Sequence, residues 1–172
     1  MLQLFGSVFI LFSSTMIGFS QAARIHARTS QLRLCIHAMQ RLQTEVTYGL
    51  TPLPEALQHI SKVIPSPPLA NMFYDISMML SEEGTSTQEC WLYGISKHWR
   101  KTAMKKAEKE ILERLGSTLG LSDQDNQLKH IQLAVQQLQM EEEHARANQM
   151  RLSKMWRSLG ILTGLLVTII LL

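Results

Sequence analysis

LKHIQLAVQQLQMEEEHARANQMRLSKMWRSLG, the stretch from Leu128 to Gly160, is the part of the chain that decides the fold. Ten of its positions recur at alternating spacings of three and four: Leu128, Ile131, Val135, Leu138, Glu142, Ala145, Gln149, Leu152, Trp156 and Leu159. This spacing keeps all ten on one face of an α-helix. Neither glycine nor proline interrupts the stretch before Gly160. The sequence therefore predicts one long helix with a continuous seam of inward-facing positions.

Two positions of that seam, Glu142 and Gln149, are polar. A polar residue in such a seam can pack against a partner helix and fix the register of the pair. It can equally be a solvated break in the apolar face. Spacing alone does not decide between these interpretations, and both residues are candidates for partner contact.

The long helix leads into a segment without charge, and another such segment opens the chain. Residues 158–172, SLGILTGLLVTIILL, and residues 1–23, with LQLFGSVFILFSSTMIGF, contain no Asp, Glu, Lys or Arg. About 20 apolar residues cross a bilayer core, and local thinning accommodates a shorter helix. We predict a transmembrane helix in each segment. The alternatives are a cleaved signal peptide for 1–23, which would lack its usual basic n-region, and a buried helix for 158–172.

Basic residues flank both segments on the side of the chain's centre. The first segment is followed by Arg24, Arg28, Arg33 and Arg41, with no acidic residue before Glu45. The second segment is preceded by Arg146, Arg151, Lys154 and Arg157. Such flanks mark the cytoplasmic side of a membrane helix. The sequence thus predicts a two-pass cell-membrane protein whose residues 24–157 form a cytoplasmic domain.

Residues 24–157 are predicted to be all-α, a bundle of six helices, because spacings of three and four recur and no period-two run appears. The first helix is expected to end near Gly49. Thr51 is the expected N-cap of the second, with Pro52 in its first turn. The run PSPP at 65–68 ends that helix and starts a third, which continues towards Gly84.

Three further helix starts follow. Ser86 with Glu89 has capping-box spacing, and Ser122 with Asp125 resembles it. Between them, Thr102 is the expected start of the fifth helix. Its predicted inward face consists of Ala103, Ala107, Ile111, Leu115 and Leu119.

Catalytic and cofactor motifs are not recognisable in the sequence, so we expect a protein that is not an enzyme and has no cofactor. A nucleophilic triad, a glycine-rich phosphate loop and a dinucleotide fingerprint are missing. Glu141 and His144 have the ExxH spacing of di-iron bundles, but no second ExxH accompanies them. A membrane metalloenzyme using these two residues is the alternative from another functional class. Cys35 and Cys90 fit small core residues and have no zinc-ligand spacing.

Charge is unevenly distributed in the central region. Residues 97–109 carry a net charge of +5, and residues 45–96 carry −5. The basic block consists of Lys97, Arg100, Lys101, Lys105, Lys106 and Lys109. An acidic protein partner or an anionic lipid would suit it, whereas nucleic acid is not expected, because no binding module or stacking aromatics accompany the charges. A solvated helix face balanced by Glu108, Glu110 and Glu113 is the alternative.

The chain resembles the stage III sporulation protein AB family of endospore-forming bacteria along its whole length. The resemblance rests on LFGSVFIL near the N-terminus, YGLTPLPEALQHIS from Tyr48 to Ser61, and TAMKKAEKEILERLGSTLGLSDQDNQLKHIQLA from Thr102 to Ala134, with the C-terminal SLGILTGLLVTIILL. More distantly, the domain looks like the cytoplasmic module of F-family platform proteins of type II secretion and type IV pilus systems. PLPEAL from Pro52 to Leu57, Gly84 with the residues after it, and GSTLG from Gly116 to Gly120 carry this second likeness.

The resemblance implies a platform or adaptor in the sporulation complex that joins mother cell and forespore. It implies a location on the mother-cell side, in the outer forespore membrane, and a secretion-type ATPase, stage III sporulation protein AA, as partner beside other stage III membrane proteins. Homo-oligomerisation and helix packing within a membrane channel are further hypotheses; Gly160 and Gly164 form a GxxxG for such packing. The candidate partner contacts are Lys101, Lys105, Lys106, Lys109, Gly84, Glu142 and Gln149.

Overall fold

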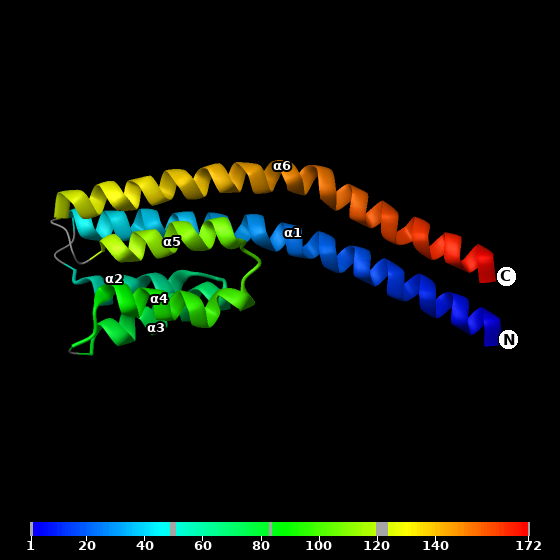
Figure 1. Ribbon diagram of the computed structural model, residues 1–172, viewed down its shortest axis with the longest axis horizontal. Coiled ribbons are helices and arrows are strands. Elements are labelled where there is room, and N and C mark those ends of the chain that lie inside the picture. The colour runs from blue at the N-terminus through cyan, green and yellow to red at the C-terminus, as the bar shows by residue number, and fades with distance from the viewer. Residues whose placement is uncertain (1, 49–50, 83, 120–123, 172) are drawn as a thin grey trace. The chain divides into compact units, whose positions relative to one another are not determined.

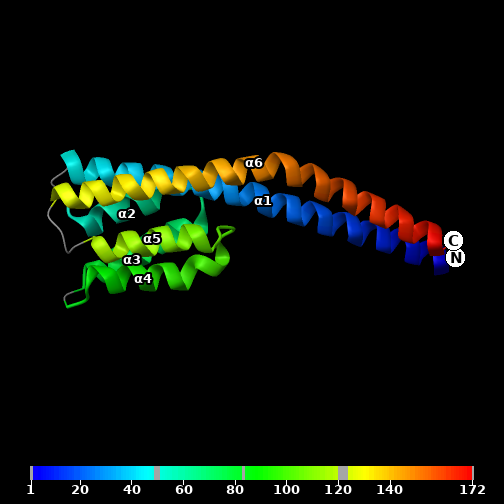
Figure 2. The same ribbon diagram turned by 45° about the horizontal axis from the view of Figure 1, so that its top comes forward.

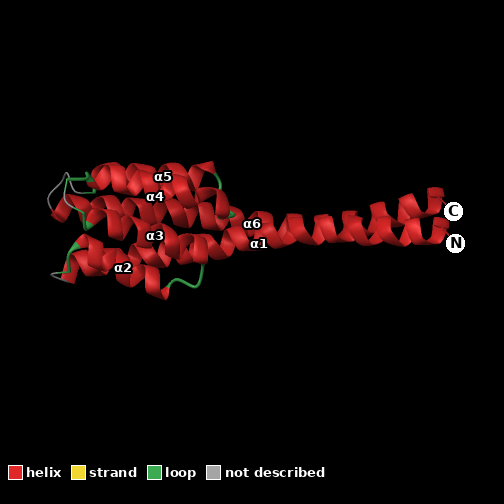
Figure 3. Ribbon diagram, turned by 90° about the horizontal axis from the view of Figure 1, so that it is seen from below, coloured by secondary structure: helices red, strands yellow, loops and turns green. Residues whose placement is uncertain are grey.

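The computed structural model describes residues 2–48, 51–82, 84–119 and 124–171. At some helix positions, chiefly 2–12 and 163–171, it describes the backbone alone. The elements are α1 (Leu2–Tyr48), α2 (Leu53–Val63), α3 (Pro67–Leu80), α4 (Thr87–His98), the 3₁₀ turn η1 (Trp99–Lys101), α5 (Lys106–Thr118) and α6 (Gln124–Leu171) (Figure 1). No strand occurs among these residues (Figure 3). The predicted all-α class and the single long last helix are therefore confirmed.

The chain divides into two compact units. One contains the residues up to Thr29 together with those from His144 onward, and the other contains Ser30–Glu143. In the first unit, the beginning of α1 and the end of α6 run side by side (Figures 1 and 2). In the second, the helices α2, α3, α4 and α5 follow one another as neighbours in sequence order (Figure 3).

Membrane crossing was predicted for residues 1–23 and 158–172. Over the part of the chain whose side chains are described, no helix is long and apolar enough to cross a membrane. Most of both predicted segments lies outside that part.

The core of the Ser30–Glu143 unit is built from one apolar face of each helix. Its fully buried side chains include Leu32, Met39 and Leu42 of α1, Leu57 and Ile60 of α2, Phe73 and Ile76 of α3, Trp91 and Ile95 of α4, and Leu112 of α5. Trp91 joins three helices. Its indole N–H donates to the carbonyl oxygen of Leu112 at 2.8 Å, and its ring meets Phe73 edge-on at 6.4 Å between centroids.

Local sequence signals set most helix ends. Ser86 is the N-cap of α4, where its hydroxyl accepts the Glu89 N–H at 3.2 Å. Ser66 is the N-cap residue of α3, and prolines follow it in the first turn. Thr51 was expected to cap the second helix, but Pro52 occupies that position and the Thr51 hydroxyl donates to Glu45 instead. The predicted start of the sixth helix at Ser122 lies outside the described residues.

The fifth helix was predicted to start at Thr102, and this was wrong. Residues 102–105 form a loop, and α5 begins at Lys106. The inward face shifts accordingly to Glu108, Leu112, Leu115 and Gly116, while Ala107 is exposed. The 3₁₀ turn ends the preceding helix and displaces the register that the apolar spacing suggested.

Candidate functional site

The six cations of the basic block lie on four consecutive elements. Lys97 is on α4, Arg100 and Lys101 are in η1, Lys105 is in the loop, and Lys106 and Lys109 are on α5. Three of the six form ion pairs: Lys97 with Asp75 at 2.8 Å, Lys106 with Glu110 at 3.3 Å, and Lys109 with Glu113 at 2.9 Å.

The other three cations, Arg100, Lys101 and Lys105, are exposed and pair with no acidic group among the described residues. Accessible positive charge therefore concentrates in residues 100–105, which we call the basic connection. Of the predicted contact residues, Lys101 and Lys105 lie within it, whereas the charges of Lys106 and Lys109 are partly balanced on their own helix.

Hydrogen bonds fix the backbone of the basic connection. The backbone N–H and the side-chain hydroxyl of Thr102 both donate to the Trp99 carbonyl, at 2.9 and 2.8 Å. The Ala103 N–H donates to the side-chain oxygen of Gln31 on α1 at 2.7 Å. Because these bonds anchor the connection to the bundle, the cations project from a defined backbone.

Glu108 has a different role from the one expected of a surface acid. It is fully buried, and its carboxylate accepts the Lys105 N–H at 2.7 Å at the start of α5. It therefore helps to order the basic connection instead of balancing exposed lysines. Burial, and secondarily the charge of Glu108, raises the pKa of the Cys35 thiol to about 12.

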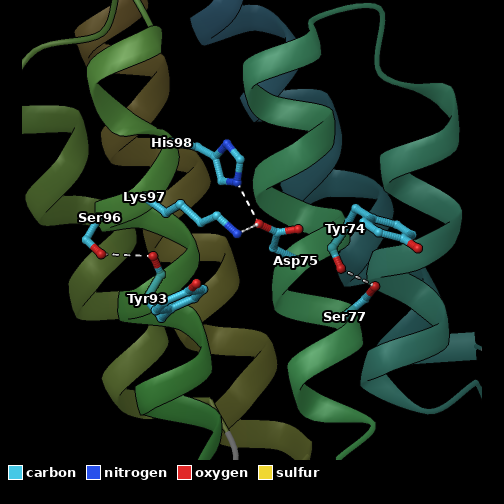
Figure 4. Close-up of polar contacts among 7 residues, drawn as sticks. All are labelled: Tyr74, Asp75, Ser77, Tyr93, Ser96, Lys97 and His98. Atoms are coloured by element: carbon cyan, nitrogen blue, oxygen red, sulfur yellow. Dashed lines mark hydrogen bonds and ion pairs between the residues drawn. The ribbon is translucent and has the colours of Figure 1, made fainter.

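A polar cluster joins α3 to the end of α4 just before the basic connection (Figure 4). One carboxylate oxygen of Asp75, Oδ2, lies 2.8 Å from His98 Nε2 and 2.8 Å from Lys97 Nζ. The hydrogen bond from His98, then that from Lys97, lowers the pKa of Asp75. In turn, Asp75 raises the pKa of Lys97, whose ammonium also lies 5.3 Å from the centroid of the Tyr93 ring.

The imidazole of His98 is buried, with 5% of the residue exposed, and its Nδ1 has no hydrogen-bond partner among the described residues. The hydroxyls of Ser77 and Ser96 bond to backbone carbonyls of their own helices and take no part in the cluster (Figure 4). Sequence reasoning missed this cluster because Asp75 and His98 are 23 residues apart and share no motif. Its geometry holds the end of α4 in place, and with it the start of η1.

The two polar seam positions of α6 both contact α1 of the same chain. Glu142 accepts a hydrogen bond from the guanidinium of Arg33 at 2.8 Å, within the Ser30–Glu143 unit. Gln149 lies 2.8 Å from Nδ1 of His26, within the unit formed by the chain ends. Both pairs are thus contacts within the chain, and a contact of Glu142 or Gln149 with another protein stays a prediction.

The glycines predicted to contact a partner or to pack membrane helices lie in different kinds of structure, a turn and a helix. Gly84 lies exposed in the turn between α3 and α4 with φ +97°, and open space surrounds the position where a Cβ would lie. A turn conformation, not close packing, explains this glycine. Gly160 and Gly164 lie within α6 at positions whose surroundings are not described.

Metal ligation has no ligand set in the described part of the chain. No three His, Cys, Asp or Glu side chains there are grouped closely enough to hold a metal ion, and His144 is exposed. Both cysteines are buried and unpaired with each other, and burial also raises the pKa of Cys90. The metalloenzyme alternative built on Glu141 and His144 therefore finds no support.

Comparison with known proteins identifies the family. The family model described as "Stage III sporulation protein AB" matches residues 3–172. The chain is 38% identical over 171 residues to Stage III sporulation protein AB of Bacillus subtilis (strain 168), covering 99% of both chains. A solved structure of Stage III sporulation protein AB is similar with a TM-score of 0.69 and 35% identity, over 73% of this chain and 98% of that one. The chain therefore belongs to the stage III sporulation protein AB family.

Proposed function

We propose that this protein is a non-enzymatic membrane platform that couples a cytoplasmic ATPase to the sporulation complex between mother cell and forespore. The observation that carries the proposal is the basic connection, in which Arg100, Lys101 and Lys105 are exposed, unpaired among the described residues and held on a hydrogen-bonded backbone. The partner would be stage III sporulation protein AA, as the resemblance to the stage III sporulation protein AB family implies.

Electrostatics supports a docking role for this connection. Clustered cations attract an acidic partner surface and speed its association, especially at low salt. Ion pairs on the same helix reduce this attraction for Lys106 and Lys109. Binding to an acidic partner should therefore depend mainly on Arg100, Lys101 and Lys105.

Attachment to the membrane completes the proposal. Residues 1–23 and 158–172 would anchor the protein in the outer forespore membrane, with residues 24–157 in the mother-cell cytoplasm. The absence of charge in both segments and the basic residues beside them support this topology. With α1 and α6 each reaching from the domain to a chain end, both anchors would be helical continuations of the domain.

The test is binding of the full-length protein, in a nanodisc, to purified stage III sporulation protein AA by biolayer interferometry. The variant Lys101→Glu with Lys105→Glu is expected to weaken binding at least tenfold at low salt, because two attractions become repulsions. Its helix content should be unchanged, since both side chains are exposed.

Lys62→Glu with Lys129→Glu is the matched control. Both lysines are exposed on other helices, and the double variant makes the same change in net charge. Equal losses in the two variants would indicate an effect of net charge and contradict the docking surface. No binding by the parent protein would instead move the function to the membrane segments and to packing through Gly160 and Gly164.

A further inference from the structure

A groove of about 210 Å³ lies between α1 and α2, and the proposed function uses none of its lining residues. Ala38 and Ile60 are buried, whereas Val63 is 62% exposed. The apolar lining consists of Leu34 and Ala38 of α1, Ile60 and Val63 of α2, and Ile64 and Pro65 after it. An exposed valine beside buried apolar side chains leaves apolar surface open to water, which a binding partner could cover.

The groove also has a basic side. His37 and Arg41 line it from α1, both are exposed, and no acidic residue is among its lining residues. Arg41 has one weak internal partner, Glu45 at 3.9 Å, and the other carboxylate oxygen of Glu45 accepts the Thr51 hydroxyl. An exposed pair at this distance contributes little, so the Arg41 guanidinium is available to a carboxylate from outside.

The spacing of the lining residues fits a helix. On α1, Leu34, Ala38 and Arg41 are spaced by four and three. On α2, Ile60 and Val63 are spaced by three, and Ile64, directly after the helix, continues this second stripe. Two such stripes form the walls of a groove that takes apolar anchors from a third helix. Because His37 and Arg41 line only the α1 side of the groove, the acidic residues of the bound helix would lie along α1.

We propose that this groove binds an acidic amphipathic helix of a partner protein, with apolar side chains against Ala38 and Val63 and carboxylates on His37 and Arg41. Charge decides against a second copy of this chain as the occupant. In a two-fold interface through this groove, His37 and Arg41 of one chain would lie close to His37 and Arg41 of the other, with no acidic residue of the groove between them. A helix with acidic flanks satisfies both the apolar and the charged parts of the site.

The test uses two fluorescent 18-residue peptides and the full-length protein in amphipol. One peptide has Leu at helical i, i+3, i+4 and i+7 positions with Glu beside them, and the other has Lys in place of Glu. Fluorescence anisotropy is expected to show the acidic peptide binding at least tenfold tighter than the basic one. Val63→Glu should weaken binding of the acidic peptide at least tenfold, because it removes an apolar contact and adds a carboxylate that repels those of the peptide. This side chain is largely exposed, so the fold should tolerate the change.

Arg41→Glu supplies a charge exchange. It should lower affinity for the acidic peptide and raise affinity for the basic one. Leu133→Glu is the control, since Leu133 is a 47% exposed apolar residue of α6 outside the groove, and it should change neither affinity. Equal binding of both peptides, insensitivity to Val63→Glu, or displacement of the acidic peptide by dodecanoate at equal concentration would overturn the proposal, the last by indicating a lipid site. These outcomes do not involve residues 100–105, so they leave the ATPase experiment unaffected.

Discussion

Gly116 lies against the indole of Trp91, and this contact makes Gly116→Ala an informative substitution. A Cβ at position 116 would lie 2.2 Å from Trp91 Cδ1 and 2.5 Å from Cγ. The ring cannot easily move away, because Trp91 is buried, bonded to the Leu112 carbonyl and in contact with Phe73. The added methyl group must therefore displace the residue that joins α3, α4 and α5.

The expected free-energy change combines three effects. Overpacking a core costs about 1–3 kcal/mol. Displacing the indole from the Leu112 carbonyl leaves a buried N–H without its acceptor, at a cost of about 1–3 kcal/mol. Alanine is the better helix former by about 1 kcal/mol, which offsets part of this. We expect a net destabilisation of about 3 kcal/mol, which for a chain of this size lowers Tm by roughly 10 °C.

The assay is thermal unfolding of the full-length protein, followed by the loss of helical circular dichroism. Ser117→Ala is the control: it changes the neighbouring residue of α5, removes only a local hydroxyl bond to the Arg114 carbonyl, and should leave Tm nearly unchanged. In a double-mutant cycle, Trp91→Leu makes room for the new methyl group, so the two substitutions together should cost at least about 1 kcal/mol less than their sum. Additive costs, or a Tm raised by Gly116→Ala, would refute the reasoning.

Three further predictions concern charge, capping and thiol chemistry. The lowered pKa of Asp75 means that its ionised form stabilises the folded state, an effect fully present above about pH 4 and lost as pH falls through the lower folded pKa. The Tm difference between the parent and Asp75→Asn should therefore be smaller below about pH 3 than at neutral pH. Ser86→Ala removes the N-cap bond of α4 and should cost about 1 kcal/mol in urea unfolding, whereas Ser86→Asp should restore most of it. Cys35 and Cys90 should react with a disulfide reagent near neutral pH only after denaturation, since both are buried and have raised pKa values; fast modification of the native protein would contradict this.

Helix ends that have their own chemical signals could be predicted from the sequence. Ser86 with Glu89 starts α4 as expected, and the proline run after Ile64 separates α2 from α3. The seam of α6 was equally readable from Leu128 to Gln149, because one period continues over these turns, whereas Leu159, which the same period predicted to face inward, is 43% exposed. These features depend on residues near one another in sequence.

Other features escaped the prediction, some because apolar spacing does not indicate a local turn or a buried charge and the rest because they depend on residues distant in sequence. The fifth helix begins four residues late because Thr102 bonds to the Trp99 carbonyl and closes a turn, which apolar spacing alone does not indicate. Glu108 was taken for a surface acid, although it is buried where α5 begins. The cluster of Asp75 with His98, and the groove between α1 and α2, arise from the packing of separate helices. The predicted partner contacts at Lys101 and Lys105 remain predictions.

The division of the chain into two units has a consequence for the order of folding. The Ser30–Glu143 unit is one continuous segment, whereas the other unit combines the residues up to Thr29 with those from His144 onward, as the His26–Gln149 contact illustrates. During synthesis from the N-terminus, the continuous unit can acquire its core as soon as Glu143 has left the ribosome. The other unit must wait for the last helix and then close a loop of more than a hundred residues. Prior folding of the middle shortens that search, because the Arg33–Glu142 bond holds the two ends of the continuous unit together before the C-terminal end of the chain is complete.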